Sequence, residues 1–151
     1  MTDLDIRPAT RDDVPAIVAM LADDPLGAQR ESPADLAPYL AAFDRITADP
    51  CQLLLIATKN GRPAGTLQLT IISGLSRKGT TRALIEAVRV HADLRGEGLG
   101  TVLIEDAIGR ARELGARIVQ LTSDASRTDA HRFYERLGFT SSHLGFKLEL
   151  R

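Results

Sequence analysis

Residues 95–101 read Arg95-Gly96-Glu97-Gly98-Leu99-Gly100-Thr101 and separate a long apolar strand over 82–91 from an amphipathic helix over 98–114. Glycines at such a turn let the backbone approach a ligand closely, and the helix N-terminus adds a positive end. Arg95 can donate charge-assisted hydrogen bonds to phosphate oxygens. The turn therefore predicts a phosphate site, although a plain strand-to-helix turn also uses glycine.

Two common phosphate-binding motifs do not fit this turn. The Rossmann fingerprint G-x-G-x-x-G requires a third glycine where Thr101 stands, and the strand before the turn belongs to an antiparallel run. A Walker loop requires a Gly-Lys-Ser/Thr ending, which the turn does not have. The sequence therefore predicts a pyrophosphate cradle of another kind.

The segments on either side of the turn predict a mixed sheet with helices packed on it. Lys59-Asn60-Gly61-Arg62 is a strong hairpin signal, because Asn-Gly adopts the positive φ angles of a type I′ turn. Ahead of the turn we expect a strand over 4–8, a helix capped by Thr10 and running to about 22, a loop over 23–31, a helix opened by Ser32-Pro33, strands over 52–58 and 63–73, and a loop over 74–80. After the helix over 98–114 we expect a strand over 117–123, a helix ending at Gly138, and closing strands over 139–142 and 144–150.

The expected fold class is therefore α/β (α+β), with a mostly antiparallel sheet flanked by helices in the order β-α-α-β-β-β-α-β-α-β-β. The length of 151 residues predicts a single domain over 1–151. The apolar share of 44% and charged share of 26% are typical of globular proteins.

The net charge and the lengths of the apolar runs limit the classes of partner and the cellular location that we expect. The net charge of -1 argues against a dedicated nucleic-acid binder, whose phosphate contacts demand a basic excess. Apolar runs such as 53–57 are far shorter than the ~20 residues of a membrane helix, and the acidic N-terminus has no apolar segment, so we expect a cytoplasmic protein. The single Cys51 excludes an internal disulfide, and no histidine pattern suggests a metal.

Two motifs resemble those of the GNAT superfamily of N-acetyltransferases. Residues 95–100 resemble its R-x-x-G-x-G/A signature, and residues 130–139, Ala130-His131-Arg132-Phe133-Tyr134-Glu135-Arg136-Leu137-Gly138-Phe139, resemble its later A-x-x-F-Y-x-x-x-G-F motif. The resemblance implies that the turn holds the pyrophosphate of acetyl-CoA, and that the preceding strand splays at a bulge and pairs with pantetheine through its main chain. The implied cofactor-binding residues are Val88, Arg89, Val90, Arg95, Gly96, Glu97, Gly98, Leu99, Gly100, Thr101 and, in a region where the family pattern matches less closely, Arg127.

The resemblance also implies a reaction, which is transfer of acetyl to a primary amine of a small molecule or peptide by direct attack. Tyr134 would protonate the departing thiolate, since a phenol is protonated at neutral pH, although its helical spacing also suits a core aromatic. Glu86 would deprotonate the amine, although an ion-paired edge glutamate is an equal alternative. The roles of Asp124 and His143 stay open, as does a homodimer. The rival interpretation is a non-catalytic module that binds acyl-CoA.

Overall fold

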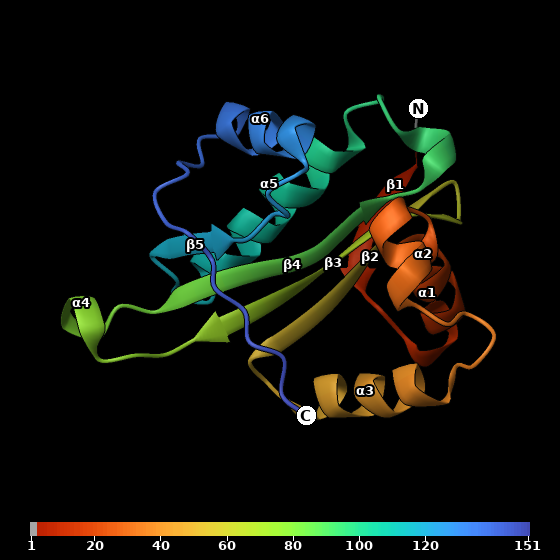
Figure 1. The fold of residues 1–151 in the computed structure, drawn as a ribbon, viewed down its shortest axis with the longest axis horizontal. Coiled ribbons are helices and arrows are strands. Elements are labelled where there is room, and N and C mark those ends of the chain that lie inside the picture. The colour runs from red at the N-terminus through yellow and green to blue at the C-terminus, as the bar shows by residue number, and fades with distance from the viewer. Residues whose placement is uncertain (1–2) are drawn as a thin grey trace. The chain divides into compact units, whose positions relative to one another are not determined.

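The structure is a computed structural model that describes residues 3–151 (Figure 1). Met1 and Thr2, which begin the acidic N-terminal stretch, lie outside the described residues. The chain forms two compact units, Met1–Gln120 and Leu121–Arg151. A single domain over 1–151 stays a prediction.

The sheet has five strands in the order β1-β2-β3-β4-β5, and its first four strands are antiparallel. Asn60 and Gly61 have φ angles of 53° and 78°, so the β2–β3 hairpin turns through the two residues that the sequence predicts. The strands are β1 (Leu4–Pro8), β2 (Gln52–Lys59), β3 (Arg62–Ile72), β4 (Arg82–Val90) and β5 (Ile118–Leu121).

Helices of the first unit pack on both faces of the sheet. On one face, Ile17 and Met20 of α1 form a buried cluster with Ile56 of β2. On the other face, Leu103 of α5 lies beside Gly65, where an added Cβ would meet its side chain at 3.4 Å. The helices are η1 (Arg11–Asp13), α1 (Val14–Ala22), α2 (Pro25–Arg30), α3 (Ala37–Ala48), α4 (Ser76–Gly79), η2 (Ala92–Leu94), α5 (Leu99–Glu113) and, in the second unit, α6 (Thr128–Arg136). The predicted fold class is confirmed.

The region between α1 and α3 differs from the prediction. The short helix α2 lies where a loop over 23–31 is expected, because Asp24 accepts a hydrogen bond from the Gly27 amide as N-cap and Pro25 occupies the first helical position. The helix α3 begins at Ala37 rather than directly after Ser32-Pro33. Pro38 explains this later start, because a proline is tolerated in the first turn of a helix but would break the interior of a helix that began at Pro33.

The two predicted closing strands, over 139–142 and 144–150, are wrong for the described structure. No residue after α6 is assigned to a strand, and the alternating side chains of Leu144, Phe146, Leu148 and Leu150 are at least 85% exposed. An alternating pattern shows which side chains would share a face, but a strand also requires a backbone partner. The pattern alone could not supply that partner.

Candidate active site

The turn between β4 and α5 presents bare backbone in a left-handed conformation. Gly96 and Gly98 have φ angles of 85° and 81°, and Gly98 is the N-cap of α5. A Cβ atom built on either glycine would meet no described residue within 4 Å apart from the glycine's two chain neighbours. Both glycines are therefore required by backbone conformation, and the space beside them is open to a ligand.

The same turn is anchored at its helical end. Leu99, the first residue of α5, is 7% exposed, and Gly100 and Thr101 follow it in the first helical turn. Amides in the first turn of a helix have no intrahelical acceptor, so they are free to bind an anion. The geometry suits the pyrophosphate of acetyl-CoA.

The strand β4 contains a bulge a few residues before the turn. Gln68 pairs with Glu86 while Thr66 pairs with Arg89, so the β3 residue between them faces two residues of β4. Ala87 has a φ of 55°, a left-handed conformation that is uncommon for a residue with a Cβ. The bulge implied by the family resemblance is present. It interrupts the ladder directly beside Val88, Arg89 and Val90, the residues expected to pair with pantetheine.

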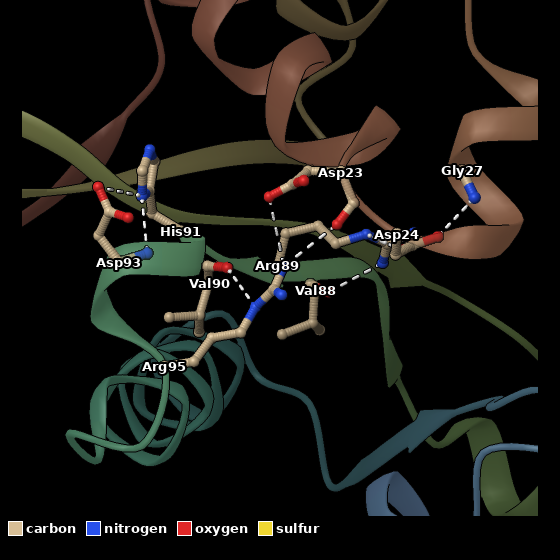
Figure 2. Close-up of polar contacts among 9 residues, drawn as sticks. All are labelled: Asp23, Asp24, Gly27, Val88, Arg89, Val90, His91, Asp93 and Arg95. Carbon is tan, nitrogen blue, oxygen red and sulfur yellow. Dashed lines mark hydrogen bonds and ion pairs between the residues drawn. The ribbon is translucent and has the colours of Figure 1, made fainter.

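Two adjacent acids at the end of α1 hold two arginines of this region (Figure 2). The Nε of Arg89 lies 3.0 Å from Oδ2 of Asp24, and its Nη1 donates to the Val88 carbonyl at 2.9 Å. Arg95 donates to the Val90 carbonyl at 3.3 Å and to the Asp23 carbonyl at 3.2 Å. The chain thus ties the predicted pantetheine strand and pyrophosphate turn to one junction between α1 and α2.

A cavity of about 190 Å³ lies beside the glycine turn. On one side of it, Glu97 pairs with Lys59 of β2 at 3.1 Å. This ion pair ties the glycine turn to the end of β2, just before the β2–β3 hairpin turns. The lining residues are Leu4, Lys59, Leu94, Glu97, Gly98, Leu99 and Val102.

Glu86 is exposed on β4 at the last regular pair before the bulge. Its cross-strand partner Gln68 donates from Nε2 to Oε1 of Gln52 at 2.8 Å, and Thr70 donates to the same oxygen at 2.9 Å. Sequence reasoning missed this polar network. The sequence signals were two polar residues, Gln68 and Thr70, at alternate positions of one otherwise apolar strand, and Gln52 at the start of another.

The second unit contains the remaining predicted residues. Arg127 is the N-cap residue of α6, and the ring of Tyr134 makes edge contacts with Phe133 and Phe139 at centroid distances of 5.1 and 5.8 Å. Asp124 accepts hydrogen bonds from the amide and hydroxyl of Ser126, which is a turn-capping arrangement. These contacts show that the A-x-x-F-Y segment forms a local aromatic cluster.

Residues 3–151 contain neither a cluster of metal-ligating side chains nor a helix fit to span a membrane. In that range no group of three His, Cys, Asp or Glu side chains has a metal-binding arrangement. None of the helices there combines the length and the apolar character needed to cross a membrane.

Comparisons with known proteins identify the family of this chain. The aminoalkylphosphonate N-acetyltransferase of Salmonella typhimurium is 28% identical over 142 residues, which cover 94% of this chain and 88% of that protein. The glucosamine 6-phosphate N-acetyltransferase of Trypanosoma brucei brucei is 36% identical over 90 residues, which cover 60% of this chain and 59% of that protein. The crystal structure of a transcriptional regulator from Bacillus halodurans C-125 has a TM-score of 0.93 and 43% identity, covering 97% of this chain and 99% of the other. Residues 15–139 match the Acetyltransferase (GNAT) family, and since this span includes both motifs and the bulged strand, the chain belongs to that family and is an acetyl-CoA-dependent acetyltransferase.

Proposed function

We propose that this protein transfers the acetyl group of acetyl-CoA to the primary amine of a small molecule. The observation that carries the proposal is the pairing of a bulge at Ala87 with an open glycine turn at Gly96 and Gly98. The bulge frees backbone groups for an extended amide chain, and the turn offers amides to an anion. Pantetheine and pyrophosphate have those two chemistries in that order.

In the proposed reaction the amine nitrogen forms a bond to the acetyl carbonyl carbon as the carbon–sulfur bond breaks. Glu86, directly or through one water, takes the proton that the amine loses. Backbone amides near Val88 to Val90 stabilise the negative charge on the carbonyl oxygen. Tyr134 gives its proton to the thiolate, and exchange with water restores both side chains. Alignment of the two reactants supplies much of the acceleration.

A small polar amine is the proposed acceptor class. Two relatives are named for an aminoalkylphosphonate and for glucosamine 6-phosphate, which are both small amines that carry a phosphorus oxyanion. The resemblance to the first of these spans nearly the whole chain. We therefore place an amine with a nearby anionic group first among the substrates to be tested.

The experiment is a measurement of CoA release from acetyl-CoA with a panel of amines. The panel contains an aminoalkylphosphonate, glucosamine 6-phosphate, a polyamine, an amino acid, an aminoglycoside and a peptide. We expect turnover of at least one small amine and none without an amine. Thermal stabilisation by CoA without turnover of any panel member would contradict the proposal and favour a CoA-binding module.

The Glu86 assignment has its own test within the same assay. Glu86→Gln removes the base and keeps the size of the side chain, so kcat should fall most at low pH, where the amine is protonated. Raising the pH should partly restore the rate because it supplies free amine. A Glu86→Gln variant with an unchanged pH profile would remove Glu86 from the mechanism.

A further inference from the structure

A polar row crosses the sheet face that α1 covers, next to Glu86. Leu54 and Ile56 of β2 pack against helical residues of that face, and Gln52 shares the face because side chains alternate along a strand. Thr70 lies opposite Gln52, and Gln68 lies opposite Leu54. The row therefore consists of Gln52, Thr70, Gln68 and Glu86, beside an apolar cluster.

Gln68 and Glu86 are direct cross-strand partners. Side chains of such a pair project from the same face with Cβ atoms about 5 Å apart. Because the bulge at Ala87 begins at the next position, Glu86 is the last β4 residue held in regular register with β3 before the ladder is interrupted. The two side chains therefore border the place where the ladder opens.

The hydrogen bonds of this network fix the direction of the Gln68 amide. Its Nε2 donates to Oε1 of Gln52 at 2.8 Å, and Thr70 donates to the same oxygen at 2.9 Å, so both bonds involve the Gln52 carbonyl. The Gln68 amide nitrogen is thus bound to a neighbour, and its carbonyl oxygen Oε1 keeps its capacity to accept. Gln68 and Gln52 are half-buried, which makes the arrangement more rigid than a surface pair.

We propose that the side-chain carbonyl of Gln68 binds the acceptor amine beside the Glu86 carboxylate, with Gln52 and Thr70 holding the amide in that orientation. This inference rests on the proposed N-acetyltransfer and extends it to the amine site. A neutral primary amine has two N–H groups; Glu86 takes the proton of one as the nitrogen bonds to the acetyl carbon, while Gln68 accepts a hydrogen bond from the other. Since Gln68 cannot take the proton, it orients the nitrogen lone pair toward the thioester without competing as a base.

The recognised chemistry is that of an unhindered primary amine. One N–H must remain for Gln68 after Glu86 has taken a proton, and the nitrogen must fit between two side chains of adjacent strands. Gln52 and Thr70 act only through Gln68, so they are positioning residues rather than groups that touch the substrate.

The test uses the full chain, acetyl-CoA and the amine with the highest kcat/KM in the panel described above. Gln68→Leu should raise the KM for that amine about tenfold, the scale of one hydrogen bond, while the calorimetric Kd for CoA stays unchanged. An unchanged amine KM in Gln68→Leu would overturn the inference. Absence of turnover by the wild-type protein with every amine would instead overturn the proposed function, so the two failures are distinguishable.

A second pair of variants separates the orientation of the Gln68 amide from its packing. It tests the proposed amine site even if the Gln68→Leu protein does not fold. Gln52→Leu removes the acceptor that holds the Gln68 amide, so the amine KM should rise with CoA affinity unchanged. Gln52→Glu keeps an acceptor and cannot donate, so it should hold Gln68 in the same direction and restore the wild-type KM. Equal KM values in Gln52→Leu and wild type, or equal defects in both Gln52 variants, would contradict the proposal.

Discussion

The guanidinium of Arg95 donates to the backbone carbonyl of Asp23 at 3.2 Å, and the same nitrogen lies 3.6 Å from the Asp23 carboxylate. Arg95 belongs to the glycine turn, whereas Asp23 caps the C-terminal end of α1. Both side chains are more than half exposed. Arg95, the arginine expected to bind the cofactor phosphates, therefore already lies beside the Asp23 carboxylate, whose negative charge repels phosphates.

Removal of this carboxylate should strengthen cofactor binding. In Asp23→Asn the Arg95 guanidinium keeps its carbonyl contact but loses a competing anion, so CoA affinity should rise about 2- to 5-fold, the scale of an exposed ion pair. Arg95→Ala should weaken CoA binding by about 1–3 kcal/mol. Isothermal titration calorimetry measures both. A gain from Asp23→Asn that persists in the Arg95→Ala background would show that Arg95 is not the cause.

A valine at Gly98 tests the pyrophosphate site. Gly98→Val adds a β-branched side chain where φ is 81° and fills the open space beside the turn, so CoA binding should be lost. The matched control is Gly115→Val, at an exposed position of similar φ, 89°, just after α5. Both variants should lose about 1–2 kcal/mol of unfolding free energy from the left-handed conformation. Equal CoA affinity in the two variants would contradict the site.

The bulge on β4 gives a second test through Ala87. Ala87→Gly suits a φ of 55°, so the bulge and CoA affinity should be retained. Ala87→Val strongly disfavours that conformation and should restore regular pairing or strain the strand, with a loss of about 1–2 kcal/mol and at least tenfold weaker CoA binding. Chemical denaturation and calorimetry measure the two effects. Normal CoA affinity in Ala87→Val would show that the bulge does not serve the cofactor.

Local signals explain which parts of the fold could be predicted. The Asn60-Gly61 turn, the Thr10 cap and the apolar spacing of α5 are encoded within a few residues, and each of them is found where the sequence places it. The helix α2 was missed because its six residues have too short an apolar pattern, so its existence depends on the Asp24 cap.

The candidate site likewise contains some features that the sequence reveals and others that it does not. The glycine turn has a sequence signature, whereas the left-handed Ala87 has none, because alanine gives no sign of a positive φ. The Gln52–Gln68–Thr70 network joins residues up to 18 positions apart and depends on the register of β2 against β3. Register is a tertiary property, and the alternation of side chains alone does not reveal which residues face each other.

A half-buried acid near the N-terminus, Asp13, predicts that the protein loses stability at low pH. The Asp13 carboxylate accepts hydrogen bonds from Arg7 at 2.7 and 3.1 Å and from the Thr10 amide at 2.7 Å. The bond to Arg7 is the main cause that holds the pKa of Asp13 below its usual 3.8. Because the pKa of Asp13 is lower in the folded protein, its carboxylate contributes fully to the free energy of unfolding above about pH 5. That contribution is lost as the pH falls through 3.8 toward the folded-state pKa.

The prediction is a comparison of the unfolding free energy at different pH values. Asp13→Asn should lower it by about 1 kcal/mol at pH 7, the scale of a lost cap and ion pair, and the difference from wild type should shrink below pH 4. Urea denaturation at several pH values measures this. A difference that stays constant from pH 7 to pH 3 would show that the Asp13 charge is not responsible.

The most direct test of the acetyltransferase mechanism is kcat for Tyr134→Phe with the best amine of the panel. The variant keeps the ring that contacts Phe133 and Phe139, so folding and CoA affinity should change little. If Tyr134 protonates the CoA thiolate, kcat should fall by about 10²–10⁴, and higher pH should not restore it as it does for Glu86→Gln. A Tyr134→Phe variant with the wild-type kcat would contradict the mechanism and leave Tyr134 only as a member of the aromatic cluster with Phe133 and Phe139.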